Sequence, residues 1–144
     1  MSEENKTLSR RVLEEVFSAG NLDVVDEIVS EDHVHHDPAM PEEGHGRERV
    51  KEFASMYRSA FPDIHIEIED QIAEGDRVAT RWRGTGTHEG DLMGISPTGN
   101  RMTVVGTTID RIADGQIAET WDNYDALGMM QQVGAIPSPE ETQG

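Results

Sequence analysis

Apolar residues recur at helical spacing in the first part of the chain. One set runs from Leu8 to Phe17, with charged residues between its members, and ends before Gly20. Since one face of an α-helix carries every third or fourth residue, this spacing predicts an amphipathic helix that stops at the glycine. A shorter set, from Leu22 to Val29, predicts a second helix, and the two apolar faces should pack as a hairpin.

Two more helices are predicted further along the chain. One covers about residues 47–60, carries Tyr57 on its apolar face and ends at Pro62. The other is short and lies around residues 126–133. Between the second and third helices, residues 33–38 should form a short extended piece, because the residue before a proline avoids the helical region.

After residue 62 the apolar period changes to two. Isoleucines at 64, 66 and 68 alternate with polar residues, which predicts a strand with one buried face. Three further alternating stretches predict three further strands, at residues 77–88, 101–112 and 116–125. Their short connections predict an antiparallel meander, and only residues 89–100 form a longer loop.

This order of elements predicts an α+β fold. Helices in a block followed by strands pack together on one face of the sheet. We expect a strongly curved antiparallel sheet with the N-terminal helices on its concave face, a cone-shaped barrel that encloses a blind pocket. One domain over residues 1–134 accounts for the pattern, and the Pro- and Glu-rich tail over 135–144 is expected to be disordered.

Composition narrows the function classes. The chain has 144 residues and a net charge of −17, with 12 Lys and Arg against 29 Asp and Glu. Nucleic acids and anionic membranes both need a basic face, so this balance argues against either partner. The absence of Cys excludes thiol chemistry. No apolar stretch approaches membrane-spanning length and the N-terminus has no signal-like apolar region, so a cytoplasmic location is expected.

The last strand carries the first candidate for chemistry, a carboxylate beside a Trp. Side chains alternate along a strand, so Ala118, Thr120 and Asp122 should share one face. The opposite face should carry the intervening residues Ile117, Glu119 and Trp121. If Asp122 looks into an apolar cavity, desolvation favours its protonated form, which suits a general acid or base. The alternative is a strand-end Asp bonded to nearby backbone.

A histidine-rich segment, His33-Val34-His35-His36-Asp37, matches the H-x-H-x-D pattern of metallo-β-lactamase-like hydrolases. His and Asp suit zinc or iron. In that fold, however, the pattern follows a strand and needs further ligands, whereas here a helix precedes it. Alternation also separates His36 from His33 and His35. We therefore predict no metal here, and we expect His36 to point into the cavity and the other two to lie at the surface.

His88 ends a glycine-rich stretch and has two interpretations. It is either a surface residue at a strand end or a residue of the pocket rim that bonds Asp122 or a substrate oxygen.

Eight short segments carry a resemblance to a known family: NLDVVDE (21–27), HDP (36–38), FPD (61–63), IAEGDRV (72–78), GTGTH (84–88), MGISPTG (93–99), RIADG (111–115) and WDNYD (121–125). In this order they resemble the SnoaL-like polyketide cyclase, or ester cyclase, family over about residues 5–134.

The resemblance implies a nuclear-transport-factor-two-like cone fold, which agrees with the predicted elements. It also implies closure of the last ring of an aromatic polyketide by intramolecular aldol condensation, without metal or cofactor. The acid/base Asp of that family matches Asp122. Its neighbouring His corresponds to Thr108, which cannot share protons with Asp122 as a His can.

We therefore expect a cofactor-free acid/base enzyme of lyase or isomerase type that acts on a small hydrophobic carbonyl compound. Asp122 would move the proton, and His88 and His36 would orient the oxygen. The residues assigned to the pocket wall are Trp82, Thr108, Thr120, Met93 and Tyr57. The alternatives are a dehydratase, isomerase or epoxide hydrolase on the same fold, or a non-catalytic small-molecule-binding protein.

A homodimer through the convex face of the sheet is also expected. Its basis is a set of apolar strand residues too large for the inner face to absorb, namely Val78, Trp82, Val104, Ile117 and Trp121. Members of the resembled family usually dimerise in this way.

Overall fold

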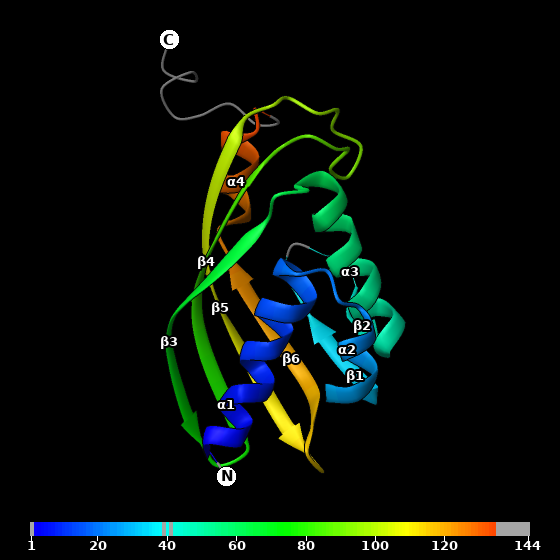
Figure 1. Cartoon of the computed structure of the whole chain (residues 1–144), viewed down its shortest axis with the longest axis vertical. Helices are drawn as coiled ribbons and strands as arrows, with labels where there is room; N and C mark the ends of the chain where they lie inside the picture. Colours follow the sequence, from blue (N-terminus) through cyan, green and yellow to red (C-terminus); the bar gives the residue numbers. More distant parts are fainter. Residues whose placement is uncertain (1, 39, 41, 135–144) are drawn as a thin grey trace.

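Helices at the N-terminus cover one side of a curved sheet (Figure 1). In the computed structural model, which describes residues 2–38, 40 and 42–134, α1 (Ser2–Arg11) continues into a π-helical segment, η1 (Val12–Ser18). Gly20, with φ of +76°, then turns the chain into α2 (Asp23–Ile28). The predicted helical hairpin is therefore present. The tail at 135–144 lies outside the described residues.

The other two helices lie where the apolar spacing predicts them. Helix α3 (Arg47–Ala60) buries the face that carries Phe53 and Tyr57, and the backbone N–H of Phe61 bonds the Tyr57 carbonyl at its end. Helix α4 (Ala126–Gln132) begins at Asp125, whose side chain accepts from the backbone N–H of Gly128. No described helix is long and apolar enough to span a membrane.

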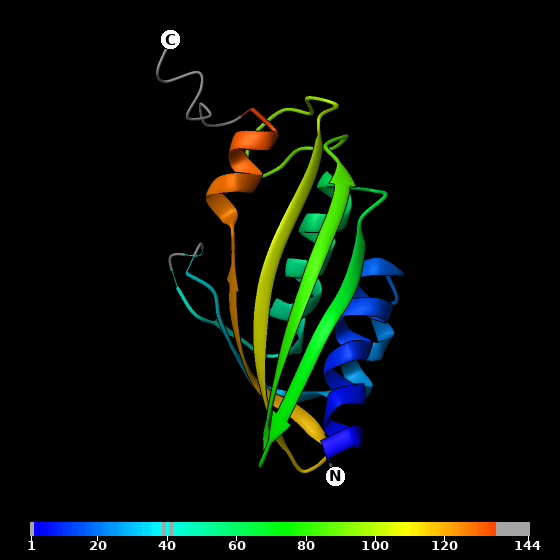
Figure 2. The same ribbon diagram turned by 90° about the vertical axis from the view of Figure 1, so that its left-hand side faces the viewer.

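Over the described residues the sheet has six strands, in the order β2-β1-β6-β5-β4-β3. The predicted meander consists of β3 (His65–Glu74), β4 (Arg77–Thr87), β5 (Arg101–Ala113) and β6 (Gln116–Tyr124). Each of these strands pairs antiparallel with the next. Figure 2 looks onto the outer face of this meander, with α3 behind it. The curved α+β architecture is confirmed.

Two further strands were not predicted at full length. Strand β1 (Val29–His36) includes residues 33–36 of the short piece that was predicted to be extended, begins earlier than predicted at the end of the predicted second helix, and pairs with β2 (Gly44–His45). Strand β1 runs parallel to β6, with His35 opposite Thr120, so the sheet is mixed and not wholly antiparallel. The helix prediction was wrong at Val29, which is extended and buried where α2 ends.

A bulge in β6 changes which residues face the helices. Ile112 pairs with Ile117 and Arg111 pairs with Glu119, so Ala118 is an extra residue on β6. The insertion shifts the alternation by one. Ile117 is therefore buried on the same side as Asp122, and the prediction that it lies on the opposite face was wrong.

The core lies between the helices and the concave face of the sheet. Four of the five residues offered as a dimer surface belong to this inner face: Val78, Trp82, Val104 and Ile117 are all buried. The helices therefore absorb the apolar surface that was expected to lie outside. On the convex face, β5 exposes Val105 and Ile109 instead.

Candidate active site

A cavity of about 90 Å³ lies between the helices and the concave face of the sheet. Side chains from α1, η1 and α3 form one wall, and β1 with β3–β6 forms the other. Most of the lining is aliphatic or aromatic. The polar side chains fall mainly into two hydrogen-bonded rows, which we call the His35 row and the His33 row after the histidines of β1.

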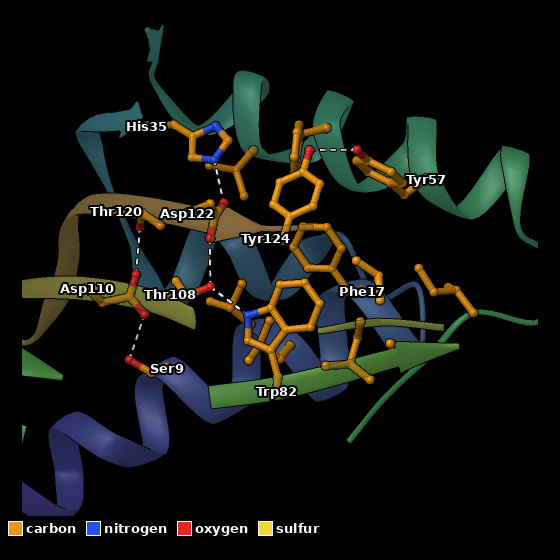
Figure 3. A pocket seen from close by; sticks show the side chains of 18 of the residues that line it. Ser9, Phe17, His35, Tyr57, Trp82, Thr108, Asp110, Thr120, Asp122 and Tyr124 are labelled. Carbon is orange, nitrogen blue, oxygen red and sulfur yellow. Dashed lines mark hydrogen bonds and ion pairs between the residues drawn. The ribbon is translucent and has the colours of Figure 1, made fainter. Parts of the chain in front are cut away.

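The His35 row consists of His35, Asp122, Thr108 and Trp82 (Figure 3). His35 Nε2 lies 2.7 Å from Asp122 Oδ2, and the Thr108 hydroxyl donates to Asp122 Oδ1 over 2.6 Å. Trp82 Nε1 donates to Thr108 Oγ1 over 2.9 Å. Because an indole N–H can only donate, the Thr108 proton is left for Asp122. The carboxylate is therefore fixed from two sides.

Strand register explains how these residues meet. Thr108 of β5 pairs directly with Asp122 of β6, and directly opposed side chains on one face of an antiparallel pair are neighbours. The parallel pairing of β1 brings His35 to the other side of the same carboxylate. Three strands that follow one another in the sheet thus supply one residue each.

The His33 row consists of His33, Thr120, Asp110 and Ser9. The hydroxyls of Ser9 and Thr120 donate to the two oxygens of Asp110, each over 2.7 Å, and His33 Nε2 lies 2.8 Å from Thr120 Oγ1. Asp110 pairs with Thr120 across β5 and β6. Figure 3 shows Ser9, Asp110 and Thr120 linked beside the His35 row.

Burial sets the protonation of the His33 row. Desolvation raises the pKa of Asp110 to about 6, although the hydrogen bonds from Thr120 and Ser9 oppose the change. Desolvation also lowers the pKa of His33 to about 4, with a further contribution from the nearby His35. His33 is therefore a neutral imidazole at pH 7.

Two tyrosines close the cavity beside Asp122. The Tyr57 and Tyr124 oxygens lie 2.8 Å apart, and Tyr124 donates to Asp37 Oδ2 over 3.1 Å. A carboxylate oxygen accepts, so the Tyr124 hydroxyl donates its one proton to Asp37. The Tyr57 hydroxyl must then donate to the Tyr124 oxygen. Burial raises the pKa of Tyr57 to about 12 and raises the pKa of Tyr124 as well, so both remain neutral phenols.

Three ligand-type groups converge near this point. Donor atoms of His35, Asp37 and Asp122 all lie within 4.8 Å of one another. His35 and Asp122 already share a hydrogen bond, and Asp37 already accepts from Tyr124. Coordination through His35 Nε2 would have to replace its bond to Asp122. The donor set as arranged suits proton sharing better than coordination.

Four of the residues assigned to the pocket wall, Trp82, Thr108, Thr120 and Tyr57, lie in it together with Asp122. Met93 does not. It is 45% exposed in the loop between β4 and β5, at a left-handed turn with φ of +47°. The prediction that Met93 lines the pocket was wrong, because this loop folds on itself through the Leu92–Ile95 bridge.

The prediction for His36 was also wrong. Its ring stacks on Trp121 with centroids 5.3 Å apart, and its Nε2 lies 2.7 Å from Glu119 on the outer face of the sheet. Alternation along β1 does separate it from His33 and His35, as expected. The register with β6, however, turns those two histidines inward, and this reverses the predicted assignment.

His88 lies outside the cavity wall and does not contact Asp122. It is fully buried, and its Nδ1 accepts from the backbone N–H of Thr98 over 3.3 Å. Its ring packs against Phe61. His88 therefore anchors the loop that follows β4, and neither interpretation drawn from the sequence, rim or surface, was right.

Sequence reasoning missed the site residues His35, His33, Asp110, Ser9 and Tyr124. The available signal was the two-residue spacing of His33 and His35, because side chains at that spacing on a strand point to the same face of the sheet. Which face is inward depends on a partner strand more than 80 residues away.

Comparison with known proteins gives one consistent result. The family model for SnoaL-like polyketide cyclase matches residues 7–133. The chain is 29% identical over 140 residues to aklanonic acid methyl ester cyclase DnrD of Streptomyces peucetius, which covers 92% of this chain and 93% of that protein. It is 30% identical over 128 residues to nogalonic acid methyl ester cyclase of Streptomyces nogalater, covering 87% of this chain and 93% of the relative.

A solved structure shares the same fold. TsrD from Streptomyces laurentii superposes with a TM-score of 0.84 at 26% identity, covering 94% of this chain and 98% of TsrD.

Proposed function

The chain belongs to the SnoaL-like polyketide cyclase family, and from this premise we propose that it closes a ring in a small hydrophobic carbonyl compound by acid/base catalysis with Asp122, without a cofactor. The observation that carries the proposal is the arrangement of the His35 row. A carboxylate held by His35 and Thr108 borders a cavity whose lining is mostly aliphatic and aromatic. A positioned base beside a mostly apolar wall suits removal of a proton from carbon.

The proposed reaction is an intramolecular aldol addition, in which no atoms are gained or lost. Asp122 takes a proton from a carbon beside a carbonyl, and the electrons of that C–H bond form an enolate. The enolate carbon attacks a second carbonyl carbon of the same molecule, so a C–C bond forms as the C=O π bond breaks. The resulting alkoxide then takes back the proton that Asp122 holds.

The neighbours of Asp122 have positioning roles in this scheme. Each carboxylate oxygen accepts one bond, from His35 or from Thr108, and keeps a second lone pair for the substrate. Thr108 stands where the family His was expected, and His35 of β1 supplies an imidazole from the other side. His36 and His88, which lie elsewhere, have no part in orienting the oxygen.

Cavity size supports a small substrate. The cavity holds about 90 Å³, whereas an engineered protein cavity of about 150 Å³ accommodates benzene. A short-chain compound therefore fits the cavity as it stands, a single ring needs it to widen, and a fused polycyclic compound is far too large. The latter would require the wall formed by the helices to move.

The test compares ring closure by wild type and Asp122→Asn. Substrates are a short linear diketone and, because two relatives carry these names, the methyl esters of aklanonic and nogalonic acids. We expect product formation by mass spectrometry and a loss of about 10²- to 10⁴-fold in Asp122→Asn.

Asp70→Asn, a matched change at an exposed site on β3, should retain the activity. Turnover that persists in Asp122→Asn would overturn the assigned base. Tight binding without turnover of any substrate would favour the small-molecule-binding alternative.

We also propose a homodimer through the convex face. Val105 and Ile109 are 52% and 37% exposed near the middle of this face, and burying them against a second copy would remove apolar surface from water. Two chains of −17 repel, and salt screens charges beyond about 8–10 Å. Light scattering should show more dimer as salt rises; a monomer mass at every salt concentration contradicts the proposal.

A further inference from the structure

One atom of the His33 row has no hydrogen-bond partner. His33 is 2% exposed, yet its Nδ1 bonds to nothing among the described residues. Its Nε2 bonds Thr120, and both oxygens of Asp110 are paired. A buried imidazole nitrogen left without a partner is costly, and this one belongs to a side chain in the cavity wall.

The row fixes which nitrogen of His33 carries the proton. Ionised Asp110 can only accept, so Ser9 and Thr120 must both donate to it. The Thr120 hydroxyl has one proton, which it donates to Asp110. His33 Nε2 must therefore donate to Thr120, and Nδ1 carries a bare lone pair.

A purely structural role does not account for this arrangement. Ser9 and Thr120 already satisfy Asp110, so the carboxylate does not need the imidazole. An apolar side chain at position 33 would fill the same space without an unpaired acceptor. The low pKa of His33, about 4, also keeps the ring neutral and Nδ1 unprotonated at pH 7.

We propose that His33 Nδ1 is a second binding point in the cavity, which accepts a hydrogen bond from a neutral hydroxyl of the substrate. His33 and His35 are two residues apart on β1, or about 7 Å along a strand. A ligand that reaches both rows therefore carries its hydroxyl about one aromatic ring away from the carbon that Asp122 deprotonates. The proposal deepens the proposed function and rests on it only in placing the substrate in this cavity.

The class of ligand follows from the lining. The wall contains two carboxylates, Asp110 and Asp122, and no Lys or Arg. An anionic group would meet repulsion from both. A single-ring phenol or enol, apolar except for one donor, satisfies both the aliphatic wall and the bare nitrogen.

The first measurement is the tautomer of His33. Two-dimensional ¹⁵N NMR of the full chain at pH 8, where Asp110 is ionised, should show His33 protonated on Nε2 and bare on Nδ1. A His33 ring protonated on Nδ1 would overturn the proposal directly, without any ligand or variant.

The second measurement uses phenol and toluene, which share a ring and differ in the donor. Titrations followed by NMR give the ratio of the two affinities. In His33→Phe the phenol-to-toluene ratio should fall by about 3- to 10-fold, the effect of one net hydrogen bond. In His36→Phe, the same change on the outer face, the ratio should stay at the wild-type value.

A ratio that does not change in His33→Phe would refute the binding point. If that variant fails to fold, Thr120→Val provides the same test, because loss of the Thr120 acceptor mixes the tautomers and should lower the ratio. Neither probe can react, so the titrations report binding alone and do not depend on catalysis by Asp122. Failure here is therefore distinct from failure of the proposed catalysis.

Discussion

Each polar row of the cavity contains a His, an Asp and a Thr from the same three strands, but in a different order; the fourth member is Trp82 of β4 in one row and Ser9 of α1 in the other. In the His35 row β5 supplies the hydroxyl, Thr108, and β6 supplies the carboxylate, Asp122. In the His33 row β5 supplies the carboxylate and β6 the hydroxyl. Strand β1 adds a histidine to each row.

This exchange decides what each histidine touches. His35 meets a carboxylate directly, so a proton can be shared between an imidazole and a carboxylate. His33 meets a hydroxyl, which separates it from Asp110 and fixes its tautomer. The first arrangement suits proton transfer and the second suits recognition. Position within the row, more than residue type, determines the chemistry.

The largest effect should come from exchanging the order in the His35 row. Thr108→Asp combined with Asp122→Thr keeps the composition but places a hydroxyl between His35 and the carboxylate. Because the base then lies on β5, away from His35, we expect activity to fall by at least about 100-fold. Ring-closure assays measure the change, and thermal melting checks that the double variant folds. Activity close to wild type would mean that the order of the row has no catalytic importance.

The pH dependence of stability should separate the two partners of the His33 row. Asp110 has a folded pKa of about 6, above its ordinary 3.8, so its contribution to stability falls as pH rises from about 4 to 6. His33 has a folded pKa of about 4, below its ordinary 6.5, so its contribution rises with pH over about 4 to 6.5. Each change is on the order of 3 kcal/mol at about 1.4 kcal/mol per pKa unit, and the two oppose each other.

Single variants should expose each slope. In Asp110→Asn the free energy of unfolding from denaturant titrations should rise between pH 4 and 6.5, and in His33→Gln it should fall over pH 4 to 6. The rest of the chain is the same in both variants, so slopes of opposite sign are the result that identifies the pair. Identical pH profiles for the two variants would show that the row does not carry these shifts.

A smaller effect is expected from the Trp82 end of the His35 row. Trp82→Phe keeps a ring in the cavity wall but removes the N–H that directs the Thr108 proton toward Asp122. Loss of one such hydrogen bond should lower kcat by about 3- to 10-fold. Trp121→Phe, on the outer face, is the matched control and should leave kcat unchanged. Equal rates for Trp82→Phe and wild type would argue that Thr108 needs no orienting donor.

No change is expected from metal removal. The His35 row has a third ligand-type neighbour in Asp37, but its donor atoms are already engaged in hydrogen bonds. Protein dialysed against zinc-free buffer should contain no stoichiometric metal by elemental analysis and should keep its activity. Stoichiometric zinc that survives dialysis and is lost in His35→Ala would contradict this prediction.

The sequence determined the local elements and one half of the site. Apolar residues at every third or fourth position predicted the helices, and apolar residues at every second position predicted the four strands of the meander. Alternation within β6 placed Thr120 and Asp122 on one face, and both line the cavity. These features could be predicted because helical and strand periods are properties of neighbouring residues.

Only the tertiary structure decided which histidines join that site. Alternation grouped His33 with His35 against His36, but two faces are equivalent until a partner strand is chosen. The parallel pairing of β1 with β6 made that choice, and the bulge at Ala118 turned Ile117 inward in the same way. The parallel pairing depends on contacts between segments about 85 residues apart, and the bulge depends on how β6 pairs with β5; the alternation within a single strand holds information on neither. The carboxylate was therefore found from the sequence, whereas its imidazole partner was not.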